Sequence, residues 1–219
     1  MDTSHSEDTR GRWIHPAGAV GAILIALAML YSFLTASDSG ETAADLIAFA
    51  KDNQGEIWTT QLIALAAPML IGLFVASLWM RLRGASEGYR ALVLLGGTLF
   101  VAFLATGLTL WSAPLFETDA LSVNAAEAYL AFDDAGWVLL GLSGVSIGAM
   151  IVGASLAALE LGWLPKWAGW VGVALGVLSL ATVMAIGFFA WAIWLIAAGV
   201  WTLWRGTRSA QVTPVETAV

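Results

Sequence analysis

The sequence contains no cysteine among its 219 residues. Disulfide bonds, thiolate metal sites and cysteine catalysis are therefore excluded. Charge is also scarce, because Asp, Glu, Lys and Arg make up 11% of the chain, against roughly 25% in soluble domains. Hydrophobic residues make up 59%. This composition argues against a soluble enzyme and predicts an integral membrane protein.

Basic residues and histidines are few. The chain has 9 Lys and Arg against 16 Asp and Glu, for a net charge of −7, which disfavours nucleic acid as a partner. The only histidines are His5 and His15, and no His-x-x-x-His or Glu-x-x-His spacing occurs. We therefore expect no catalytic metal, no haem and no other cofactor.

Long apolar tracts predict an all-α polytopic bundle with six membrane spans. The expected spans are Pro16–Thr35, Ile57–Met80, Ala91–Ala113, Gly136–Leu159, Pro165–Met184 and Ala185–Trp204. They form a membrane domain over residues 16–204, between a cytoplasmic tail at 1–15 and a disordered cytoplasmic tail at 205–219.

The last two spans are inferred from one uncharged run. Lys166 and Arg205 enclose 38 residues without a charge, about twice what one crossing needs. We expect a tight turn near Met184–Gly187. The alternative is a five-span chain with one long, tilted helix.

Charge asymmetry gives the orientation. Eight of the nine basic residues lie in the two terminal tails or in the loops that follow spans two and four. The loops that follow spans one and three hold the ninth, Lys51, together with ten acidic residues. The positive-inside rule therefore places both termini in the cytoplasm.

Both outer loops are expected to contain short amphipathic helices. Thr42 and Asp45 have capping-box spacing, with apolar residues at 43, 46, 47 and 50. Asn124 and Glu127 could cap a second helix that continues into span four. Such helices could cover the outer mouth of the bundle or serve as interfacial connectors.

Ionisable residues are missing from the interior of the predicted spans. Glu160 lies at the cytoplasmic end of span four, near Trp163. Proton-coupled transport, voltage sensing and a retinal Schiff base each need an ionisable group at depth, so these functions are disfavoured.

Neutral polar residues gather instead toward the outer ends of spans two and three. If their faces converge with the acids that start span four, they form an outward-facing cleft for an amphiphile or a cation. The alternative is that the hydroxyl groups bond to helix carbonyls or across helix contacts. The candidate ligand-binding residues are Gln61, Thr106, Thr109, Ser112, Asp133 and Asp134.

Small-residue spacing and a tryptophan stripe mark the second half of the chain. Gly144-x-x-x-Gly148 and Gly172-x-x-x-Gly176 favour close helix packing, within the chain or in a homodimer. Trp191, Trp194 and Trp201 share one stripe of span six, for which packing or lipid contact is preferred over lining a ligand pocket.

The stretch Leu164-Pro165-Lys166-Trp167-Ala168-Gly169 opens span five. It resembles the Leu-Pro-Lys/Arg-Trp-x-Gly motif of uncharacterised bacterial, actinobacterial-type six-span membrane proteins. This resemblance implies a bundle in the cell membrane and supplies no catalytic residues.

Three functional hypotheses remain. The preferred one is a non-enzymatic accessory, scaffold or lipid-interacting membrane component, whose partners are membrane lipids, other membrane proteins or a second copy. The alternative is a facilitator or carrier for a hydrophobic or amphiphilic small molecule through the outer cleft. The third is a membrane enzyme using Asp133 and Asp134 as acid and base, which ranks last because adjacent helical residues point about 100° apart.

Overall fold

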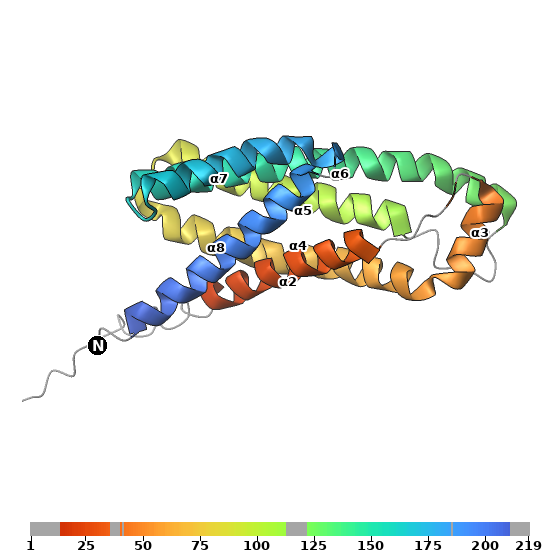
Figure 1. The fold of residues 1–219 in the computed structure, drawn as a ribbon, viewed down its shortest axis with the longest axis horizontal. Coiled ribbons are helices and arrows are strands. Elements are labelled where there is room, and N and C mark those ends of the chain that lie inside the picture. Colours follow the sequence, from red (N-terminus) through yellow and green to blue (C-terminus); the bar gives the residue numbers. More distant parts are fainter. Residues whose placement is uncertain (1–13, 36–39, 41, 113–121, 185, 211–219) are drawn as a thin grey trace, which may run out of the picture.

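The protein is an all-α bundle, as predicted (Figure 1). The computed structural model describes residues 14–35, 40, 42–112, 122–184 and 186–210, and within these ranges it contains helices and no strand. The elements are α2 (Ile14–Thr35), α3 (Ala43–Asp52), α4 (Gln54–Arg81), η1 (Leu82–Gly84), α5 (Glu87–Ser112), α6 (Val123–Glu160), α7 (Lys166–Leu178), η3 (Ser179–Met184) and α8 (Ile186–Ala210).

Five of these helices, α2, α4, α5, α6 and α8, are long and apolar enough to cross a membrane. Helix α7 has only 13 residues, or about 20 Å at 1.5 Å per residue. The 6 residues of η3 follow, with a kink at Ala181, whose φ of −90° and ψ of 29° are not helical. The predicted fifth span, Pro165–Met184, therefore corresponds in sequence to α7 followed by the kinked η3, and α7 alone is shorter than the ~30 Å hydrocarbon core of a bilayer.

The chain turns back between η3 and α8, inside the predicted turn region. A Cβ atom added to Gly187 would lie 2.6 Å from the carbonyl carbon of Ala181 and 2.8 Å from the carbonyl oxygen of Leu178. Only glycine therefore allows α8 to start directly against the preceding segment.

Helix α6 packs against α5 and against α7. On the α7 side, the two predicted glycine motifs meet each other. A Cβ atom added to Gly148 would lie 2.6 Å from the carbonyl oxygen of Gly176, and one added to Gly176 would lie 3.0 Å from that of Gly148. These motifs serve helix packing within the chain.

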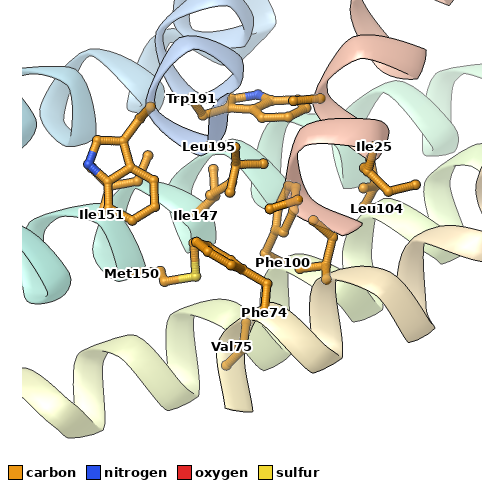
Figure 2. Packing of buried hydrophobic residues seen from close by; sticks show 14 of the residues in the cluster. Ile25, Phe74, Val75, Phe100, Leu104, Ile147, Met150, Ile151, Trp191 and Leu195 are labelled. Carbon is orange, nitrogen blue, oxygen red and sulfur yellow. The ribbon is translucent and has the colours of Figure 1, made fainter. Parts of the chain in front are cut away.

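The centre of the bundle is a close-packed core with several aromatic rings. Trp191 is 1% exposed, and its ring centroid lies 5.5 Å from that of Phe100 and 4.9 Å from that of Phe188. Figure 2 shows Trp191, Leu195 and Ile151 within this core, which also includes Phe74 and Met150.

The sequence predicted the starts of α3 and α6 with different success. Thr42 caps α3 as expected, because its side-chain oxygen accepts from the backbone N–H of Asp45 at 3.2 Å. The second helix does run into span four. However, its N-cap is Ser122, which accepts from the Ala125 N–H at 3.2 Å, and the predicted cap at Asn124 is wrong.

Helix α3 packs against the first turns of α6 in a small separate cluster. Leu46, Phe49 and Ala50 of α3 are buried there with Ala126 and Tyr129 of α6. This cluster lies at the end of the molecule farthest from the start of α7 (Figure 1).

The predicted tail boundary at residue 205 differs from the structure. Helix α8 continues through Ala210, because Arg205 to Ala210 contain no proline and a cation near a helix C-terminus is favourable. The predicted tails at residues 1–13 and 211–219 lie outside the described residues.

Candidate functional site

A pocket of about 1270 Å³ opens at the end of the bundle that carries the basic loops. We call it the basic-end pocket. It is formed where the first residues of α2 and α7 meet the last turns of α4, α6 and α8. Representative lining residues from these five helices are His15, Trp167, Arg81, Ser155 and Trp201.

The pocket exists because α7 and α8 diverge from their shared turn toward the basic end (Figure 1). Helix α7 packs closely against α6 along a line of glycines that includes Gly148, Gly172 and Gly176, which we call the glycine seam. Within this seam, Gly172 packs on Ser155. Helix α8 crosses onto α2, where a Cβ atom added to Gly199 would lie 2.9 Å from the carbonyl oxygen of Ala19. The space between α7 and α8 is backed by the ends of α4 and α6.

The wall of this pocket is mostly apolar and contains four tryptophans. These are Trp163, Trp167, Trp194 and Trp201. In the tryptophan stripe of span six, Trp191 packs in the core, Trp194 packs in the core and also lines the pocket, and Trp201 lines the pocket. The expected packing role is confirmed for Trp191 and Trp194, because both belong to the core and the ring centroid of Trp194 lies 6.3 Å from that of Phe74.

Polar groups occupy defined places in this apolar wall. His15 Nδ1 and Ser77 Oγ lie 2.9 Å apart and join the start of α2 to α4. Arg81 follows one turn later on α4. Ser155 is 1% exposed, and its hydroxyl has no hydrogen-bond partner among the described residues. Thr202 lines the pocket on α8 and is 7% exposed.

The depth of the pocket follows from the helical positions that line it. Lining residues run from Trp167 to Leu175 on α7 and from Trp194 to Leu203 on α8. At 1.5 Å per residue these stretches measure about 12 and 14 Å. One leaflet contributes about half of a ~30 Å hydrocarbon core, so the depth of the pocket is comparable to one leaflet.

The core closes the inner end of the pocket. Trp191 lies about one helical turn beyond Trp194, and Ile151 lies one turn beyond Ser155. Both Trp191 and Ile151 are almost fully buried, together with Leu195 (Figure 2). Their close packing separates the basic-end pocket from the opposite end of the bundle.

The residues predicted to form an outer cleft differ in how far their side chains are buried. Gln61 is 6% exposed, and its side-chain Nε2 has no hydrogen-bond partner among the described residues. Thr106 and Thr109 are exposed on α5. The face of α5 that enters the core carries Phe100, Leu104 and Leu108 instead. The side chain of Ser112 lies outside the described residues.

The two acidic candidates lie in the third turn of α6, beyond the α3 cluster. Asp133 is half-buried and Asp134 is exposed. This difference is expected for neighbouring residues that point about 100° apart on a helix. Neither lines the basic-end pocket.

Within the part of the chain that the structure describes, no group of three or more His, Asp or Glu side chains could hold a metal ion. The site is therefore argued from shape, charge and hydrogen-bonding groups. In comparisons with known proteins, no protein-family model, no curated protein and no solved structure matches the chain.

Sequence reasoning missed the basic-end pocket because its wall comes from five helices that are far apart in the chain. Each lining residue is also ordinary in its own segment, since Trp and Arg are common near the ends of membrane spans. One signal was present: Trp163, Trp167 and Trp201 gather near Lys166, Arg81 and the final basic residues once the spans are folded back on one another.

Proposed function

We propose that this protein is a non-enzymatic integral protein of the bacterial cytoplasmic membrane that binds a membrane lipid or another amphiphile. The observation that carries this proposal is the basic-end pocket, which combines an apolar, Trp-rich wall with Arg81 at the end of α4. Small-molecule pockets typically measure about 300–1,000 Å³. A volume of about 1270 Å³ leaves room for a large apolar ligand.

Lipid extraction followed by native mass spectrometry of the detergent-purified protein tests this function. Ala197 lines the pocket and is exposed, so Ala197→Trp should fill space without disturbing the core. Val200 is 53% exposed on the same helix outside the pocket lining, so Val200→Trp is the matched control. We expect a co-purifying lipid with wild type and Val200→Trp, and its loss with Ala197→Trp.

A wild-type protein that retains no lipid or metabolite would refute the proposal. The same conclusion would follow if Ala197→Trp and Val200→Trp retained equal amounts.

The carrier hypothesis receives less support from the geometry. It needs a continuous cavity that reaches Gln61 and Thr106, whereas the basic-end pocket lies at the other end of the bundle and the core around Trp191 lies between. A binding protein needs no such path. Ligand binding without passage across the membrane is therefore the better supported function.

The proposed orientation has its own test, because the chain provides a cysteine-free background. Asp52 ends α3 and Arg83 lies in η1, and both side chains are exposed. With both termini in the cytoplasm, a membrane-impermeant maleimide should label Asp52→Cys in intact cells and should label Arg83→Cys only after lysis. The reverse pattern would refute the orientation.

A further inference from the structure

We propose that the ligand of the basic-end pocket is an anionic phospholipid taken from the leaflet at the basic end. This inference rests on the proposed function and makes it more specific. The phosphate of the lipid would lie at Arg81, and one acyl chain would extend between α7 and α8.

The sign of the charge carries the headgroup assignment. Among the described residues that line the pocket, Arg81 is the only one with a fixed charge, and no carboxylate lines it. Lys166 adds a second cation between the lining residues Pro165 and Trp167. A guanidinium group binds phosphate through charge-assisted hydrogen bonds.

Hydrogen-bonding groups below the rim fit the glycerol ester region of a phospholipid. The hydroxyl of Ser155 is buried without a partner among the described residues, and leaving such a group unsatisfied is costly. An ester carbonyl would accept a hydrogen bond from it. Thr202 offers a second hydroxyl on the facing helix α8.

Depth and direction fit one acyl chain from one leaflet. The lining stretches of α7 and α8 span about 12–14 Å, and the hydrocarbon of one leaflet is about 15 Å thick. The pocket ends blindly at the core around Trp191 and Leu195. Because residues of both α7 and α8 line the pocket, the proposed lipid would enter between these two helices with its headgroup at the membrane surface.

The test is a competition between two headgroups of equal chain length. Detergent-purified, delipidated full-length protein is titrated with dioleoyl phosphatidylglycerol or dioleoyl phosphatidylcholine, and bound lipid is counted by native mass spectrometry. We expect phosphatidylglycerol to bind about tenfold more tightly, as a charge-assisted hydrogen bond in a partly dry site would provide. Arg81→Gln should remove that preference.

Matched variants separate the headgroup effect from folding. Arg83 is exposed, lies two residues after Arg81 and does not line the pocket, so Arg83→Gln should keep the full preference. Arg81→Lys should retain part of it because it keeps the charge and loses the two-pronged geometry. Thermal unfolding of each variant shows whether it is folded, and the Arg81→Lys result keeps the test valid if Arg81→Gln is unstable.

The outcomes distinguish this inference from the function on which it rests. Equal binding of both lipids, abolished by Ala197→Trp, would overturn the headgroup assignment and leave the proposed function standing. No binding of either lipid, or binding that Ala197→Trp leaves unchanged, would overturn both. A dimer that Ala197→Trp dissociates would identify a second copy of the chain as the occupant and would overturn the lipid assignment.

Discussion

The contact between Gly148 and Gly176 should control the stability of the bundle. We consider Gly148→Ala, which adds one methyl group to α6 at the seam with α7. The new Cβ would lie 2.6 Å from the carbonyl oxygen of Gly176, which is 0.8 Å short of the 3.4 Å at which ordinary contact begins. Neither partner is a flexible side chain, so the two helices must separate.

The cost can be estimated from this displacement. A gap of 0.5–1 Å removes about a quarter to a half of the dispersion attraction at each affected atom pair. The neighbouring contacts along the seam, including Gly172 against Ser155, would all be weakened. Overpacking of this kind costs about 1–3 kcal/mol, so we expect Gly148→Ala to lower the free energy of unfolding by about 2 kcal/mol.

Gly72→Ala is the matched control. It makes the same chemical change inside α4, but a Cβ atom added there meets nothing within 4 Å. Replacing glycine by alanine within a helix is favourable by about 0.5–1 kcal/mol. We therefore expect Gly72→Ala to be neutral or slightly stabilising.

Reversible unfolding in mild detergent with added SDS, followed by far-UV circular dichroism, measures both variants. Equal free energies of unfolding for Gly148→Ala and Gly72→Ala would refute the seam. A Gly148→Ala protein of unchanged stability that loses a wild-type dimer would instead assign the motif to association between chains.

Two further predictions concern single side chains. Thr42→Ala removes the N-cap of α3 and should lower local stability by about 1 kcal/mol, which hydrogen exchange would show as faster exchange at residues 43–46. The control is Thr59→Ala, because the exposed Thr59 hydroxyl donates to the Gly55 carbonyl and its loss should leave exchange at residues 43–46 unchanged. Equal effects of the two variants would contradict the cap. Trp191→Ala should lower the free energy of unfolding by about 3–5 kcal/mol because it leaves a cavity at the centre of the core. Trp170→Ala, at a 61% exposed site, should change the free energy of unfolding by less than about 1 kcal/mol. Similar losses for both variants would contradict the core assignment.

Local signals in the sequence predicted local structure well. The Thr42 and Asp45 spacing predicted the start of α3, and Gly187 marked the turn before α8 because close backbone approach requires a residue without a side chain. The N-cap of α6 was assigned two residues too late. Ser122 and Asn124 are both good capping residues, and the sequence alone does not show which one adopts the extended backbone of a cap.

Contacts between distant segments were harder to predict. The two glycine motifs of spans four and five predicted close helix contacts, but the sequence did not show that the two motifs would face each other. Thr106 and Thr109 were assigned to the cleft because they lie toward the outer end of span three, and position along a span does not show which way a side chain points. The same limit hid the basic-end pocket, whose walls are set by the crossing of α8 over α2.

The length of α6 has a practical consequence. Its 38 residues extend about 57 Å at 1.5 Å per residue, which exceeds a ~30 Å hydrocarbon core by about 27 Å. The helix is continuous from Val123 into the bundle, and α3 braces its first turns. A rigid helical insertion that replaces the extended Ser122 cap and continues into Val123 in register would therefore move as one body with α6. Such an insertion would provide the particle mass and orientation marker that electron cryomicroscopy of a small membrane protein requires.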